Sequence, residues 1–361
     1  MTNPAGVGAD GYVPFKGYRT WYRVAGDLGS GIPLVLLHGG PGIPCGAFDP
    51  LMDRLAPERP VIRYDQLGCG RSDRPADPSL WRVETFLEEL AAVREALGLE
   101  RIHLLGHSWG GMLALEYLLT RPSGVISLTL SSSLCSTPFW TEELHRLRDQ
   151  LPEHVAASLR RFEAGYQPPA PKAATGPVTV RPGILPDKVA SEAGMMRRVM
   201  ALMTTGPVQR LASWASHAGP LRRPAYEIGM MAFMRRHLCR ADPFPLVVCQ
   251  DFLARNQEIY ETMWGPSECH ATGPLATWDV EGRLGEIDVP TLLLSGRHDE
   301  ATPAQQERLR AGIRGARWTV LEQSAHLGFI EEPDRYAETL ALFLGDVDGT
   351  VASRRSPAYP A

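Results

Sequence analysis

The stretch RIHLLGHSWGGMLALEYLL constrains the fold more than any other part of this 361-residue chain. Residues 101–107 are an apolar run typical of a buried strand, and the residues after Ser108 have the composition of a helix. Between them, GHSWG fits the pattern G-x-S-x-G, in which a strand turns sharply into a helix and exposes the serine. We therefore predict that Ser108 lies in a strained turn at the carboxyl edge of a sheet and acts as a nucleophile.

Strands and helices alternate along the chain on both sides of this turn. An N-terminal hairpin is expected over 12–25, and strands over 34–37, 60–66, 101–108, 125–133, 289–299 and 317–323. Helices are expected over 83–100, 109–122, 303–315 and 336–347. This alternation predicts an α/β fold with a mostly parallel central sheet covered by helices.

The middle of the chain interrupts this alternation. It is helix-like, contains the low-complexity stretch QPPAPKAATGPVTVRPG and holds most of the methionines, among them Met195, Met196, Met200, Met203, Met230, Met231 and Met234. These side chains either fill a core or form the deformable apolar underside of a helical lid. We predict a core from residues 1–137 and 281–348, a helical cap inserted at 138–280, and a disordered tail at 349–361.

Composition narrows the classes of partner and compartment. The formal charge of −4 disfavours nucleic acid or an anionic membrane as the main partner. The six cysteines are scattered without a C-x-x-C pair, so we expect free thiols in a reducing cytoplasm. The first residues lack the features of a signal peptide, and no apolar run approaches the length of a membrane span.

A nucleophilic serine needs a base and a carboxylate that orients the base. After a G-x-S-x-G turn these partners follow in the order acid, then histidine. In SGRHDE, Asp299 comes just after a predicted strand, and in EQSAHLGF, His326 comes just after the next. Both are expected at the carboxyl edge with Ser108, where open α/β sheets build their sites.

Other residues compete for these roles. His103 lies within a predicted strand, and His298 directly precedes the acid, so His326 is favoured by position. Asp299 could instead cap the helix that begins near Pro303, and Asp279 and Asp288 are weaker candidates for the acid.

The stretch PLVLLHGGPG supplies the remaining part of such a site. A short strand runs directly into three glycines and a proline, more than a simple turn needs, which indicates that backbone N–H groups must face a ligand. Acyl transfer develops negative charge on the carbonyl oxygen, and backbone N–H groups stabilise it. We predict an oxyanion hole formed by the N–H groups of Gly40 and Trp109.

Taken together, these motifs resemble the proline iminopeptidase family of α/β-hydrolases. HGGPG, DQLGCGRS and GHSWGG occur in the family's order, followed by MWGPSECHATGPLATWD, SGRHDEATP and SAH. The resemblance covers about residues 12–344. It is nearest to the branch that contains the tricorn-interacting aminopeptidase and bacterial prolinamide or amino-acid amide hydrolases.

The resemblance implies that two carboxylates bind the free α-amino group of the substrate. It places Glu268, in GPSE, and Glu300, directly after Asp299, in this role. From the residues alone, Glu268 could be a solvated loop residue and Glu300 a charge in the first turn of a helix. This chain departs from the branch at Cys269, where an aromatic residue is usual, and in the Pro-rich stretch 168–182, which looks like a mobile insertion.

The favoured hypothesis is a cytoplasmic serine aminopeptidase or amidase that cleaves the bond after an unblocked N-terminal residue of a small peptide or amino-acid amide. No metal or organic cofactor is implied, and the oligomeric state is not predicted. The alternatives are an esterase or a specialised biosynthetic hydrolase on the same scaffold, and a ligand-binding protein that has lost catalysis.

Overall fold

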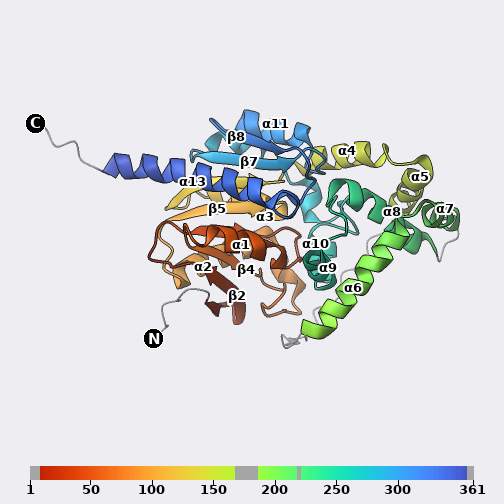
Figure 1. The fold of residues 1–361 in the computed structure, drawn as a ribbon, viewed down its shortest axis with the longest axis horizontal. Coiled ribbons are helices and arrows are strands. Elements are labelled where there is room, and N and C mark those ends of the chain that lie inside the picture. The colour runs from red at the N-terminus through yellow and green to blue at the C-terminus, as the bar shows by residue number, and fades with distance from the viewer. Residues whose placement is uncertain (1–8, 167–185, 218–220, 356–361) are drawn as a thin grey trace, which may run out of the picture.

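The computed structural model describes residues 9–166, 186–217 and 221–355. Its centre is an eight-stranded sheet in the order β1-β2-β4-β3-β5-β6-β7-β8 (Figure 1). Strands β1 and β2 form an antiparallel hairpin, β2 pairs antiparallel with β4, and every pair from β4 to β8 is parallel. The predicted hairpin and the mostly parallel sheet are confirmed.

The strands lie within or close to the predicted ranges. They are β1 (Asp10–Phe15), β2 (Tyr18–Ala25), β3 (Leu34–Leu37), β4 (Val61–Tyr64), β5 (Ile102–His107), β6 (Val125–Ser131), β7 (Thr291–Gly296) and β8 (Arg317–Leu321). β4 is shorter than expected because the chain turns at Asp65. Its carboxylate accepts hydrogen bonds from the backbone N–H groups of Cys45 and Arg71, at 3.1 and 2.8 Å.

Helices cover both faces of the sheet, so alternate side chains of the central strands enter two different cores. On one face, Leu34, Leu36 and Leu105 pack with the apolar sides of α1 and α13. On the other, Val35, Leu37 and Leu104 pack with α2 and α3. The helices of this part are α1 (Asp49–Leu55), α2 (Val83–Ala96), α3 (Trp109–Leu119), α11 (Pro303–Gly312), α12 (Gly328–Glu331) and α13 (Pro333–Arg355), with short 3-10 turns at η1 (Gly46–Phe48), η2 (Pro78–Leu80) and η5 (Glu281–Glu286).

Between β6 and β7 in the sequence, the described residues form seven further α-helices, which gather at one end of the sheet (Figure 1). They are α4 (Thr137–Arg148), α5 (Glu153–Ala164), α6 (Pro186–Met203), α7 (Gly206–Ala215), α8 (Arg222–His237), α9 (Leu246–Leu253) and α10 (Gln257–Met263), followed by the 3-10 turn η4 (Pro274–Thr277). We refer to α4–α10 as the cap. The Pro-rich stretch 168–182 lies outside the described residues.

The last helix corrects the expectation of a disordered tail from residue 349. Helix α13 continues to Arg355 because its later turns still have partners. Val347 is buried, Val351 packs against the same core, and Asp348 accepts hydrogen bonds from Arg59 and His103 at 3.1 Å each. Residues 356–361 lie outside the described part of the chain. No helix in the described residues is long and apolar enough to cross a membrane.

Candidate active site

Ser108 occupies the sharp turn between β5 and α3. Its backbone has φ 54° and ψ −121°, a combination that a residue with a side chain adopts only when its surroundings impose it. The glycines around it allow the turn to close. A Cβ on Gly106 would lie 2.2 Å from the carbonyl oxygen of Gly110, and a Cβ on Gly110 would lie 2.2 Å from that of Leu37. The backbones of β3, β5 and α3 therefore pack directly against one another around Ser108.

Asp299 and His326 follow β7 and β8, at the same edge of the sheet. His326 Nδ1 lies 2.8 Å from Asp299 Oδ1, so the imidazole N–H donates to the carboxylate. Asp299 also accepts hydrogen bonds from the backbone N–H groups of Ala301, at 2.8 Å, and Gly296, at 3.3 Å. Both side chains are almost fully buried. These bonds fix the carboxylate and thereby the orientation of the imidazole.

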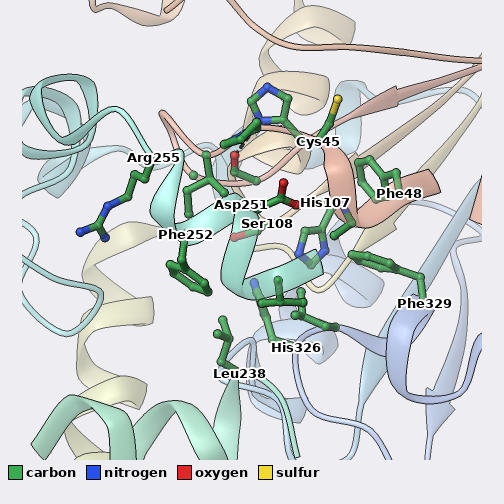
Figure 2. Close-up of a pocket in the computed structure, with 18 of the residues that line it drawn as sticks. Cys45, Phe48, His107, Ser108, Leu238, Asp251, Phe252, Arg255, His326 and Phe329 are labelled. Atoms are coloured by element: carbon green, nitrogen blue, oxygen red, sulfur yellow. Dashed lines mark hydrogen bonds between the residues drawn. The ribbon is translucent and has the colours of Figure 1, made fainter. Parts of the chain in front are cut away.

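Ser108 and His326 line one pocket of about 100 Å³ (Figure 2). Aromatic rings support the imidazole: the ring of His107 lies 4.7 Å from that of His326, and Phe329 packs against His107 at 5.0 Å. Phe48 stands beside Phe329, with ring centres 4.9 Å apart. The pocket is therefore narrow and largely apolar around the serine, a setting that strengthens electrostatic interactions within it.

The glycine-rich loop after β3 borders the same pocket. Gly39 and Gly40 line it beside Ser108. Gly40 has φ +125°, which strongly favours glycine, and a Cβ there would lie 2.8 Å from the backbone nitrogen of Gly42. Trp109 is the first residue of α3, a position whose N–H has no partner within its own helix. Gly40 thus lines the same pocket as Ser108, and Trp109 directly follows Ser108 in the chain.

Glu268 and Glu300 line this pocket from the cap side and from the loop after β7. Tyr260, on α10, donates a hydrogen bond from its hydroxyl to Glu268 Oε2 at 2.7 Å. Glu300 is 2% exposed, and its Oε1 lies 3.7 Å from His326 Nε2. The two carboxylates, which lie far apart in the sequence, therefore border the cavity that also holds the serine and the imidazole.

The carboxylates and the imidazole strongly influence one another. Burial raises the pKa of Glu268 and that of Glu300, while the neighbouring His326 lowers both. Burial by itself lowers the pKa of His326, but the charges of Asp299 and Glu300 outweigh it and raise that pKa to about 9. The negative charges of the glutamates and the positive charge of a protonated His326 therefore favour one another. A substrate cation in the same place would compete with the proton of His326.

The competing candidates lie elsewhere. His103 is buried in β5 between Ser127 and Asp348, at 2.7 and 3.1 Å. His298 accepts a hydrogen bond from His237 through its backbone carbonyl, at 3.0 Å. Asp279 accepts one from Ser136 at 2.7 Å, away from the pocket, and Asp288 is exposed. Cys269 is buried in the core and is not among the residues that line the pocket.

Two residues that border the pocket were missed by the sequence analysis. Tyr260 sits on the apolar side of α10 between Ile259 and Met263, and that periodicity is typical of a core position. Asp251, on α9, accepts a hydrogen bond from the backbone N–H of Ala47 at 2.7 Å, and burial raises its pKa to about 8. A buried phenol and a buried carboxyl both need partners, but a single sequence does not reveal that they are buried.

Known proteins are similar to this chain over most of its length. Residues 32–333 match the model of the alpha/beta hydrolase fold family. The chain is similar to the proline iminopeptidase of Heyndrickxia coagulans, with 34% identity over 94% of this chain and 99% of the relative. It is also similar to that of Levilactobacillus brevis, with 36% identity over 93% of this chain and 96% of the relative.

Two solved structures are similar over nearly their whole length. The crystal structure of VinJ has a TM-score of 0.75 and 34% identity, and the match covers 94% of this chain and 99% of the VinJ chain. The crystal structure of the Mycobacterium smegmatis proline iminopeptidase has a TM-score of 0.75 and 31% identity, and the match covers 95% of this chain and 100% of that protein's chain.

Proposed function

The chain belongs to the proline iminopeptidase family of α/β-hydrolases, and on that premise we propose that it is a serine aminopeptidase or amidase. It hydrolyses the amide bond after an unblocked N-terminal residue, with proline as the first candidate for that residue. Small peptides and amino-acid amides are its substrates. The free, buried thiols of all six cysteines support a reducing compartment such as the cytoplasm.

In this proposal Ser108, His326 and Asp299 carry out the bond-breaking steps. The Ser108 hydroxyl attacks the substrate carbonyl while its proton moves to His326 Nε2, and Asp299 stabilises the resulting imidazolium across the 2.8 Å contact. The C–N bond then breaks, and the imidazolium gives its proton to the leaving nitrogen. Water, deprotonated by His326, attacks the ester so formed and releases the amino acid and Ser108.

The N–H groups of Gly40 and Trp109 stabilise the oxyanion that forms during both attacks. Glu268 and Glu300 bind the substrate ammonium, which in a largely apolar pocket needs a carboxylate partner. Tyr260 holds Glu268 in place through its 2.7 Å hydrogen bond.

The position of Glu300 relative to the base carries this proposal. The amine of an unblocked residue is only one carbon away from the carbonyl under attack, so an amine-binding carboxylate must lie beside the catalytic histidine. Glu300 Oε1 lies 3.7 Å from His326 Nε2, on the side of the imidazole opposite Asp299. An esterase has no need for a buried carboxylate at this distance, and such a group would carry a desolvation cost.

A comparison of three chromogenic substrates tests the proposal: proline p-nitroanilide, its N-acetyl derivative and p-nitrophenyl acetate. We expect the wild type to cleave the free-amine anilide and not its acetylated form. Ser108→Ala abolishes turnover of every substrate, and Glu268→Gln lowers kcat/KM for the anilide far more than for the ester. Equal rates on the free and acetylated anilides, or an ester-only activity indifferent to Glu268→Gln, would overturn it.

A further inference from the structure

A second, larger cavity adjoins the catalytic pocket on the side of the cap. It has a volume of about 430 Å³, against about 100 Å³ for the pocket at Ser108. Six residues line both: Leu238, Phe252, Arg255, Tyr260, Glu268 and Glu300. Figure 2 shows three of them, Leu238, Phe252 and Arg255, on the side of the catalytic pocket away from Cys45 and Phe48. We call the larger cavity the cap chamber.

Methionines form much of the wall of the cap chamber. Met196 and Met200 come from α6, and Met230, Met231 and Met234 from α8. Residues four apart on a helix share a face, so each helix presents a row of thioether side chains to the same space. Unbranched methionines can adapt their shape to different apolar ligands. These side chains therefore border an open volume as well as the core, which favours the lid interpretation of the methionine-rich segment.

Two of the charged groups in the wall of the chamber, Arg223 and Glu227, pair with each other. Arg223 lies 3.2 Å from Glu227 and 3.6 Å from Glu261. Arg255 donates to Gln257, and its guanidinium carbon lies 4.9 Å from the centre of the Tyr260 ring. Apart from these groups and the two glutamates assigned to the substrate amine, Glu268 and Glu300, the wall offers mainly thioether and aromatic surface. The chamber is suited to an apolar group.

The catalytic geometry assigns this space to one part of the substrate. With the amine at Glu300 and the carbonyl at Ser108, only the first side chain and the leaving group remain to be placed. The leaving nitrogen must face His326 Nε2, from which it receives its proton, and that atom is 3.7 Å from Glu300 Oε1 on the shared wall. The small pocket at Phe48 and Phe329 is left for the first side chain.

We propose that the cap chamber binds a bulky apolar leaving group, so that the preferred substrates are amides of a small amino acid with a large lipophilic amine. This inference rests on the proposed function and specifies its substrate class. The chamber is also joined directly to the catalytic loops. At the end of α8, the His237 carbonyl accepts from Glu300 N–H and the Leu238 carbonyl from His326 N–H, each at 3.1 Å.

A series of proline amides tests this assignment: prolinamide, proline octylamide, and the amide of a diether amine as long as octylamine. We expect kcat/KM for the octylamide to exceed that for prolinamide by at least about tenfold, because an alkyl chain gains free energy with each buried methylene. The polar diether amide should gain far less. Active enzyme is counted by labelling Ser108 with a fluorophosphonate probe.

Paired variants locate the effect. Met231→Gln and Met234→Gln, in the chamber wall, should lower the octylamide-to-prolinamide ratio at least about threefold, whereas Met195→Gln is the control on α6. Met195 is 61% exposed and lies outside both cavities, so the ratio should not change in this variant. The ratio is independent of the fraction of folded enzyme, which separates binding from stability.

Several results would overturn the inference. The first is a kcat/KM for the octylamide no higher than for prolinamide, and the second is a kcat/KM for the diether amide as high as for the octylamide. The third is a change in the octylamide-to-prolinamide ratio in Met195→Gln equal to that in Met231→Gln. If kcat/KM rises when the first residue is enlarged but not when the amine is enlarged, the first side chain occupies the chamber instead. If prolinamide is cleaved without any octyl gain, only this inference fails. If no free-amine amide is cleaved, the proposed function fails first.

Discussion

Replacing Glu300 by glutamine should move the acidic limb of the pH–rate profile to lower pH. The base must be neutral to accept the Ser108 proton, so activity is lost as pH falls through the pKa of His326, which Asp299 and Glu300 raise to about 9. Removing the carboxylate nearest to Nε2 takes away a charge that favours the imidazolium. The sign is therefore fixed: Glu300→Gln lowers the pKa of His326, and the variant keeps its base neutral at lower pH.

The contact distance sets the size of this effect. Opposite unit charges at 3.7 Å interact by about 4 kcal/mol at an effective dielectric constant of about 20, equivalent to about three pH units. Burial raises the pKa of Glu300 and so disfavours its charged form, which reduces the effect below this limit. We therefore expect the acidic limb of the profile to move to lower pH by about one to two units.

The assay is the pH dependence of kcat/KM for p-nitrophenyl acetate, whose lack of an amine keeps substrate titration out of the profile. Ser108→Ala supplies the background rate. Glu322→Gln is the control: it removes a half-exposed carboxylate near His326 in the sequence, which pairs with Arg297 at 2.8 Å. A limb that stays in place in Glu300→Gln, or moves to higher pH, would refute the electrostatic coupling of base and amine site.

Three further variants test single contacts. Tyr260→Phe removes the hydrogen bond that holds Glu268 and should raise KM for proline p-nitroanilide about five- to tenfold, with a smaller effect on the ester, as steady-state kinetics will show. Gly106→Ala places a methyl group 2.2 Å from the Gly110 carbonyl oxygen and should lower the free energy of unfolding by several kcal/mol, about 3 or more, in urea titrations. Asp251→Asn should gain stability relative to wild type as pH rises. The folded pKa of Asp251, about 8, lies above its unfolded value, so the free energy of unfolding of the wild type falls as pH rises from about 4 to about 8. Unfolding curves of both proteins at the two ends of that range measure this difference.

The parts of the site that the sequence could predict are those whose local backbone dictates the residue type. Gly106 and Gly110 must be glycine because strand and helix backbones meet there, and Gly40 because its φ is positive. The constraints between Gly106 and Gly110 and between Gly40 and Gly42 act between close neighbours in the chain and therefore leave a readable motif. Asp299 and His326 were predictable for a related reason: both directly follow strands of a parallel sheet, whose carboxyl ends share one edge.

The parts that the sequence could not predict depend on contacts between distant segments. Tyr260 and Asp251 look like ordinary core and surface positions on short helices, and only packing against the core shows that each must have a polar partner. The methionines of α6 and α8 could equally have filled a solid core. Their spacing gives the face of each helix but not whether that face meets another side chain or an open space.

The cap holds the catalytic loops as well as covering them. Its backbone carbonyls accept hydrogen bonds from Glu300 N–H and His326 N–H. On the oxyanion side, Asn256 N–H donates to the Gly42 carbonyl at 2.8 Å, and Asp251 accepts from Ala47 N–H at 2.7 Å. The glycine loop, the acid loop and the base loop are thus each tied to the cap segment that also forms the chamber. Substitutions in α8 or α9 are therefore expected to alter kcat together with substrate preference, because the residues that select the substrate are bonded to the loops that act on it.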